Sequence, residues 1–65
     1  DLVDLDSALT RLQEDQPEKA RVVEMRFFGG MTEAEIAEIL GVTTRTVRRY
    51  WAYAQARLYE EMTRA

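Results

Sequence analysis

The chain has 65 residues, carries 12 acidic and 9 basic side chains, and contains neither cysteine nor histidine. A chain of this length forms one domain at most, and the missing residue types exclude disulfides, zinc fingers and imidazole catalysis. An apolar fraction of 46% suffices for a packed core, yet no apolar stretch approaches the roughly 20 residues that span a membrane. We therefore expect a soluble, cytoplasmic module with no membrane partner. Because it begins at Asp1 and not at methionine, we expect residues 1–65 to be a single domain cut from a longer polypeptide.

Two helices are predicted in the first half of the chain. Apolar residues three or four positions apart form a stripe over residues 5–12, and Asp4 is placed to cap that helix. Pro17 suits the first turn of a second helix, which we expect to run to Phe28 and to end at the glycines 29–30. Its apolar residues surround most of its circumference, which predicts a buried central helix: Ala20, Val22, Val23, Met25, Phe27 and Phe28.

Two further helices follow, and no strand is predicted. The sequence Thr-Glu-Ala-Glu at 32–35 is typical of a capping box, and Gly41 should end this third helix. Thr43 or Thr44 then caps a longer fourth helix. The apolar stripe of the fourth helix is spaced by three or four residues: Val47, Trp51, Ala54, Leu58 and Met62. The expected fold is an all-α, four-helix domain with short connections.

The connection between the third and fourth helices predicts a C-terminal helix-turn-helix. Only residues 41–43 separate the two helices, which fits strongly crossed axes. Ala37 is small where two helix backbones must approach each other, and Gly41 accepts a positive φ in the turn. Val42 and Val47 are placed to fill the wedge between the helices.

The charge of the chain is divided between its two parts. Residues 1–42 hold ten acidic and four basic residues, whereas residues 43–65 hold five basic and two acidic ones. Because salt screens charges beyond about 10 Å at 0.1 M, the local excess matters more for binding than the net charge. Three arginines and two threonines at the start of the fourth helix therefore predict a recognition helix for the DNA major groove: Thr44, Arg45, Thr46, Arg48 and Arg49.

More ordinary interpretations apply to several of these residues. A single arginine on a helix usually faces solvent, and aromatic residues at helical spacing usually belong to a core. We interpret Trp51 as a core residue and Tyr50 as half-buried, while Tyr53 stays undecided. The pair Glu60–Glu61 is interpreted as a polar helix end that has no partner base. The sequence therefore predicts no catalytic site, metal site or cofactor.

Most of the chain resembles region 4 of the sigma-70 family of transcription initiation factors. The similarity covers residues 5 to about 60 and is greatest to the extracytoplasmic-function (ECF) group and ECF-like relatives. Its main elements are the second helix that ends in Arg-Phe-Phe-Gly-Gly, the Thr-x-x-Glu-Ile-Ala segment at 32–37, Leu-Gly-Val at 40–42, and Thr-Val-Arg-Arg at 46–49. The stretch Tyr-Trp-Ala-Tyr at 50–53 departs from the further basic residues that many ECF factors carry there.

The resemblance implies a role and a set of contacts. Such a domain binds the minus-35 element of promoter DNA while it docks on the flap of the RNA polymerase β subunit. An anti-sigma factor is a further candidate partner. Matching positions imply base contacts from the fourth helix and phosphate contacts from Arg26 and Thr32, and without a region that melts the minus-10 element we do not expect this piece to initiate transcription alone. The candidate DNA-binding residues are Arg26, Thr32, Thr43, Thr44, Arg45, Arg48, Arg49 and Tyr53.

Two other classes of function remain open at this point. The LuxR-type output domain of a response regulator also has four helices and a similar recognition helix. It usually opens its second helix with a Leu-Thr-x-Arg-Glu motif, whereas this chain has Gln-Pro-Glu-Lys at 16–19, which favours the sigma-factor interpretation. A protein-interaction module, whose apolar grooves bind a partner and whose arginines are incidental, is the other alternative. An enzyme is the least favoured class.

Overall fold

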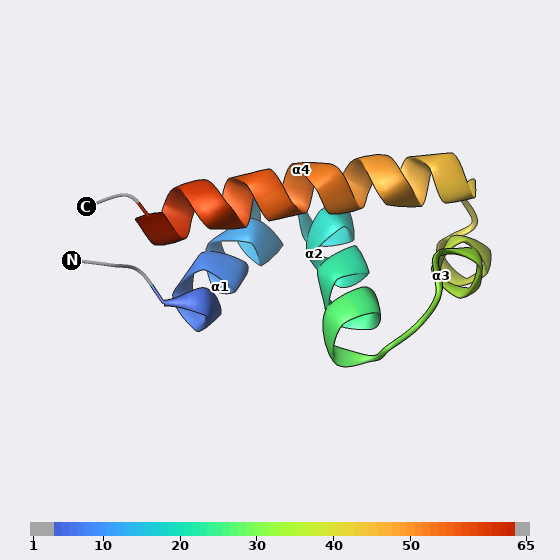
Figure 1. Cartoon of the computed structure of the whole chain (residues 1–65), viewed down its shortest axis with the longest axis horizontal. Helices are drawn as coiled ribbons and strands as arrows, with labels where there is room; N and C mark the ends of the chain where they lie inside the picture. The colour runs from blue at the N-terminus through green and yellow to red at the C-terminus, as the bar shows by residue number, and fades with distance from the viewer. Residues whose placement is uncertain (1–3, 64–65) are drawn as a thin grey trace.

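Residues 4–63 are described by a computed structural model, and they form helices with no strand among them (Figure 1). The elements in chain order are α1 (Leu5–Asp15), α2 (Pro17–Val23), a π-helical turn η1 (Glu24–Phe28), α3 (Glu33–Leu40) and α4 (Thr44–Thr63). Helix α4 lies along the length of the molecule, and α1, α2 and α3 pack beneath its C-terminal end, its middle and its N-terminal end (Figure 1). The prediction of an all-α, four-helix fold is confirmed.

Local sequence sets the start of α1 and α2. The Asp4 carboxylate accepts a hydrogen bond from the Ser7 amide at 2.9 Å, which satisfies one of the free donors at the start of α1. At the other end, the Gln16 amide donates to the Leu12 carbonyl, and Pro17 then opens α2. Proline fits there because the first turn of a helix needs no donor from it.

The end of the second helical segment differs from the prediction. Helical structure does reach Phe28, but η1 is a π-helical turn in which the Gly29 amide donates to the Glu24 carbonyl at 2.9 Å. The additional residue in this turn rotates the following side chains out of register with α2. Phe27 and Phe28 are consequently 64% and 60% exposed, so the expectation that these two side chains belong to a buried helix is wrong.

The helix-turn-helix prediction is confirmed in its local details. Thr32 and Glu35 form the reciprocal capping box, with bonds of 3.1 Å and 2.8 Å between side chains and amides. Gly41 adopts a φ of 70°, in the left-handed region, and ends α3. Thr43, not Thr44, caps α4, because its hydroxyl accepts a hydrogen bond from the Thr46 amide at 3.1 Å.

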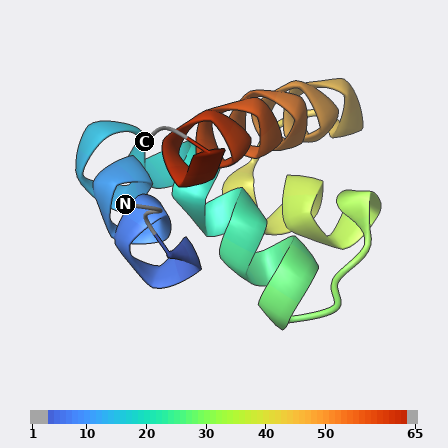
Figure 2. The same ribbon diagram turned by 60° about the vertical axis from the view of Figure 1, so that its left-hand side comes forward.

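The core consists of two clusters that α4 joins. One cluster lies between α1, α2 and the C-terminal half of α4, and its largest members include Leu9, Leu12 and Leu58. The second lies between α2, α3 and the start of α4: Val22, Ile36, Ala37 and Val47. Trp51 packs against both clusters but remains only half-buried, so its prediction as a core residue is confirmed in part. Figure 2 shows α3 crossing below α4 at the end where this second cluster lies.

Among the helices described, none combines the length and the apolar character that a membrane crossing requires.

Candidate nucleic-acid interface

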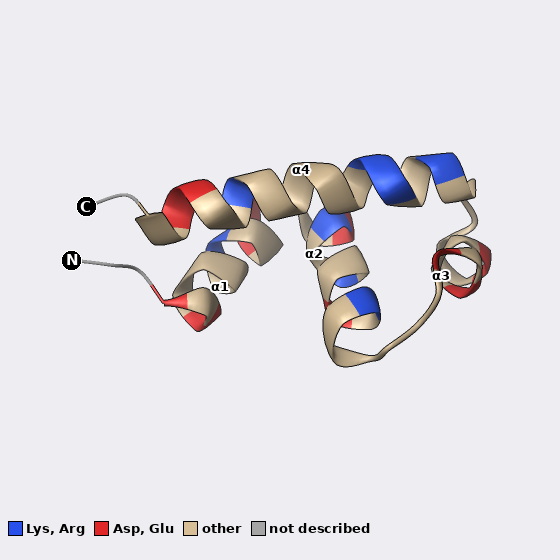
Figure 3. Ribbon diagram, viewed as in Figure 1, with Lys and Arg blue, Asp and Glu red and all other residues tan. Residues whose placement is uncertain are grey.

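The first half of α4 carries a concentrated positive charge. In Figure 3 most of the blue on α4 lies in this half, while acidic residues lie on the other helices and near the end of α4. Arg45, Arg48 and Arg49 are all exposed, and no acidic residue precedes Glu60 in the helix. The predicted recognition surface is therefore an exposed face of the second helix of the helix-turn-helix.

Arg45 and Arg49 form one line along this face. They are four residues apart, which places their side chains one helical turn from each other on the same side. Within residues 4–63 neither guanidinium makes an ion pair or a hydrogen bond to another side chain. Because neither guanidinium is engaged, both remain able to bind an external acceptor.

Arg48 is held in a different environment. Its Nη2 atom donates to the Thr44 hydroxyl at 3.5 Å, and its Nε atom lies 3.5 Å from the Glu33 carboxylate of α3. Thr44 and Arg48 are four residues apart, so they form a second line along α4 beside that of Arg45 and Arg49. The contact with Glu33 instead depends on the angle at which α3 crosses α4. Glu33 therefore fixes the direction of one arginine of the candidate reading surface.

The remaining threonines among the candidate residues also serve as helix caps. Thr32 and Thr43 cap α3 and α4 respectively, and each hydroxyl accepts a hydrogen bond from the third amide of its helix. The Thr43 hydroxyl additionally donates to the Thr46 hydroxyl at 3.1 Å. The Thr32 hydroxyl keeps its proton for another acceptor, since the capping bond uses only its oxygen.

Arg26 reaches from η1 toward both α3 and α4. Its Nη1 atom donates to the Met31 carbonyl at 3.4 Å, directly before Thr32, and its guanidinium lies 5.9 Å from the centre of the Trp51 ring. This hydrogen bond holds Arg26 near the first turn of α3, where the backbone amides have no partner within the helix. The two residues predicted to contact phosphate, Arg26 and Thr32, are thus brought together.

Lys19 is a neighbour of the candidate recognition helix α4 that the sequence did not reveal. Its Nζ atom lies 4.9 Å from the centre of the Tyr50 ring and 4.8 Å from that of Tyr53, and it donates to the Gln16 side chain at 3.0 Å. Tyr50 is half-buried, as predicted, and Tyr53 is 41% exposed, which resolves its undecided position. Helical periodicity could not reveal this group, because Lys19 and Tyr50 are 31 positions apart and meet only when α2 packs on α4.

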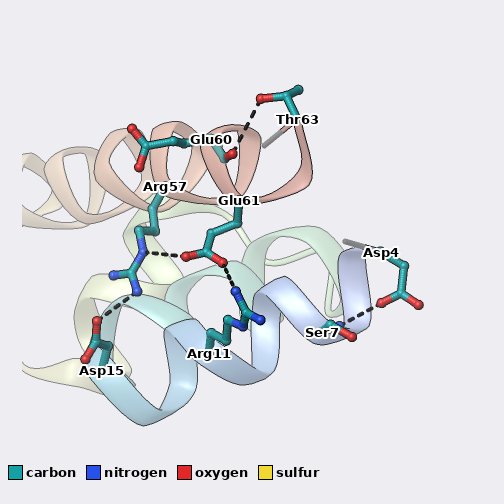
Figure 4. A network of polar contacts seen from close by, with 8 residues as sticks. All are labelled: Asp4, Ser7, Arg11, Asp15, Arg57, Glu60, Glu61 and Thr63. Carbon is teal, nitrogen blue, oxygen red and sulfur yellow. Dashed lines mark hydrogen bonds and ion pairs between the residues drawn. The ribbon is translucent and has the colours of Figure 1, made fainter. Parts of the chain in front are cut away.

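Arg57, the next arginine of α4 after Arg49, belongs to a network of ion pairs between α4 and α1 (Figure 4). Arg57 lies 2.8 Å from Asp15 and 3.6 Å from Glu61, and Arg11 donates to Glu61 at 2.9 Å. The hydrogen bond from Arg11, followed by the charge of Arg57, lowers the pKa of the Glu61 carboxyl. Glu61 is buried and paired with two arginines, so of the two residues interpreted as a polar helix end only Glu60 is exposed. These ion pairs join the end of α4 to α1.

Among the residues that the structure describes, no group of three or more acidic side chains is arranged to hold a metal ion.

The family comparison decides which interpretation of this surface applies. A model of the ECF sigma factor family matches residues 1–64, almost the whole chain. The chain belongs to the ECF sigma factor family.

This family membership favours the sigma-factor interpretation over the LuxR-type output domain. ECF sigma factors bind DNA and act in transcription initiation, and the family is not enzymatic. No curated protein and no solved structure matches the chain. The assignment therefore rests on the family model and on the helix-turn-helix that the sequence predicts and the structure contains.

Proposed function

We propose that this ECF sigma factor domain binds the minus-35 element of a promoter through the first half of α4, in the manner of region 4. The observation that carries the proposal is the line of Arg45 and Arg49. Both are exposed on the second helix of a helix-turn-helix, and neither is engaged by an acidic side chain within residues 4–63. A guanidinium in this position can bind guanine through two hydrogen bonds in the major groove.

The contacts divide into those that read bases and those that hold the backbone. Arg45 and Arg49 enter the groove, and the line of Thr44 and Arg48 lies beside them, nearer one strand. Tyr53, further along the helix, contacts the edge of the site, and Thr43 lies at its beginning. The family resemblance and the exposure of these side chains support this arrangement.

Phosphate contacts come from the other helices. Arg26 and Thr32 lie near the start of α3, where free backbone amides and the helix dipole favour an anion. Contacts of this kind fix the position of the protein on the duplex without distinguishing sequences. The acidic α1 and α3 surfaces oppose nonspecific binding, so we expect the isolated domain to bind weakly.

An apolar groove on another side of α4 is the proposed contact with the RNA polymerase β flap. Its more buried residues include Val23, Trp51 and Leu58, and its exposed aromatic residues are Phe27, Phe28 and Tyr59. Tyr59 lies ten residues beyond Arg49, about 15 Å along the helix axis. At the near end of the groove, Trp51 is two residues from Arg49 and therefore points to a nearly opposite side of the helix. A partner in the groove would leave the line of Arg45 and Arg49 open to a duplex, so one helix can hold both. An anti-sigma factor that covered this groove would compete with polymerase.

The proposal is tested by direct DNA binding. The chain is titrated against a pool of duplexes with a randomised minus-35 segment, and the selected duplex is compared with a scrambled one at several salt concentrations. We expect preference for one sequence class and an affinity that falls steeply with salt, because phosphate binding releases counterions. If both duplexes bind equally and their affinity does not depend on salt, the basic surface of α4 is not a DNA-binding surface.

A further inference from the structure

The cleft beside α4 that contains Lys19 has a charge pattern that base reading by Arg49 alone does not explain. It is lined by Lys19, Thr46, Arg49, Tyr50 and Tyr53, so two cations face it and no carboxylate does. Two like charges in one cleft repel each other unless an anion joins them. The cleft therefore has the composition of an anion site and not of an ion pair within the protein.

The ammonium group of Lys19 is held in place at this cleft. The Gln16 side-chain oxygen accepts one of its protons at 3.0 Å, and the faces of Tyr50 and Tyr53 lie within 5 Å of it. Aromatic faces attract a cation without accepting its protons as a carboxylate would. Lys19 is thus positioned and keeps donors for a further acceptor, since an ammonium has three.

The cleft also lies where α4 itself lacks positive charge. Between Arg49 and Arg57 the helix has no basic residue, and Arg57 is paired with Asp15 and Glu61. Helix α2 begins beneath the middle of α4, so Lys19 supplies a charge from another element next to this uncharged stretch (Figure 1). The line of positive charge along the reading face continues from Arg49 onto α2.

We propose that this cleft binds a backbone phosphate of the same DNA duplex, with Lys19 as its donor. The inference rests on the proposed DNA-binding function and extends it, since it adds a contact from α2. Such a contact positions the duplex and does not read its sequence. Tyr50 and Tyr53 act as positioning residues that hold the ammonium toward the phosphate.

The test compares Lys19→Gln with Arg21→Gln. Both variants lose one positive charge from α2, but positions 19 and 21 lie on nearly opposite sides of the helix, and the Arg21 side chain makes no hydrogen bond or ion pair within residues 4–63. Loss of one phosphate contact should lower the slope of log affinity against log salt by about 0.9 and weaken binding roughly five- to tenfold at 0.1 M salt. We expect this for Lys19→Gln alone, equally for selected and scrambled duplexes, with the helical content of both variants unchanged.

A second measurement does not depend on a variant. Lys19 is the only lysine in the chain, so reductive methylation with a ¹³C-labelled reagent places a single labelled side-chain amine and preserves its charge. Its NMR signal should shift on addition of the selected 20-base-pair duplex. An unshifted signal, or equal salt slopes for the two variants, overturns the cleft assignment while the unmodified chain still binds DNA; absence of DNA binding by the unmodified chain instead overturns the proposed function.

Discussion

The Glu33 carboxylate lies 3.5 Å from Nε of Arg48, and this contact joins the first helix of the helix-turn-helix to the proposed reading face of the second. It leaves a negative charge close to a surface proposed to meet DNA. Such a charge weakens binding to every sequence but fixes the guanidinium that it contacts. Its value for stability is small, about 0–1 kcal/mol for an exposed pair.

Replacing Glu33 by Gln should therefore raise the affinity for DNA of any sequence and lower the preference for particular base pairs. Scrambled DNA should bind more tightly, because a repulsive charge is lost, whereas preference at one or two base pairs should fall by about 1 kcal/mol as Arg48 loses its fixed direction. The measurement is binding to single-base variants of the selected duplex. Glu38→Gln is the control, since Glu38 is exposed on the same helix and makes no ion pair within residues 4–63. The same change in discrimination for both variants would contradict a specific role of Glu33.

The Glu61 network predicts how stability depends on pH. Hydrogen bonding from Arg11 and the charge of Arg57 lower the pKa of Glu61 below its ordinary value of 4.5. The folded state therefore binds this proton less readily than the unfolded chain, so the contribution is complete above the ordinary value and disappears as pH falls through the lowered one. The difference in free energy of unfolding between the parent and Glu61→Gln should shrink over that acidic range.

Chemical denaturation at a series of pH values measures this difference. Glu14→Gln serves as the control, because Glu14 is an exposed carboxylate of α1 without an ion pair in the described part of the chain. Parent and Glu61→Gln curves that stay parallel down to the acid limit would show that the buried carboxylate does not couple folding to protonation.

Trp51 should be required for a stable fold. It contacts both clusters of the core, and truncation to alanine would remove packing from each. A half-buried tryptophan should contribute about 2–3 kcal/mol, somewhat less than a fully buried one. Because a core in a chain of this size rarely supplies more than about 3–5 kcal/mol, Trp51→Ala should keep no more than about 0–3 kcal/mol and unfold at a much lower temperature than the parent. Thermal denaturation followed by circular dichroism measures this, with the 72% exposed Tyr59→Ala as control. If Trp51→Ala melts at the same temperature as the parent, the Trp51 ring does not stabilise the fold and belongs to a binding surface.

The apolar groove should affect polymerase binding without affecting DNA. Phe27→Ser and Tyr59→Ser change exposed side chains of the groove, so stability should change by no more than about 0.5 kcal/mol. We expect weaker binding of a purified β-flap fragment by both variants and parental affinity for the selected duplex. Ile39→Ser is the matched control, since Ile39 is 54% exposed on α3 outside the groove. Flap binding that is lost equally in all three variants, or in none, would place the polymerase contact elsewhere.

Much of the fold follows from local signals in the sequence. The Asp4 cap, the Thr32–Glu35 capping box and the left-handed Gly41 each depend on a few neighbouring residues, and all three are present in the structure. The π-helical turn η1 is different, because no residue type in the sequence predicts it. It exposes Phe27 and Phe28, which periodicity had assigned to a buried face.

In the candidate site too, some features could be predicted from the sequence and others could not. Exposure of Arg45, Arg48 and Arg49 could be predicted, since the apolar stripe of one helix fixes which residues face outward. The contacts of Lys19 with Tyr50 and Tyr53, and of Glu33 with Arg48, join residues from different helices. Such contacts depend on crossing angles that a single sequence does not contain.

The proposed reading face is tested most directly by comparing Arg49→Ala with Arg26→Ala over a library of promoter variants. Arg49 lies on the unengaged line of α4, whereas Arg26 lies on η1 beside the start of α3. Binding of each variant to every duplex is measured at fixed salt. We expect Arg49→Ala to relax preference at one or two minus-35 positions by roughly 1–3 kcal/mol, and Arg26→Ala to weaken all duplexes alike. An unchanged ranking of sequences in Arg49→Ala would contradict the proposed reading face.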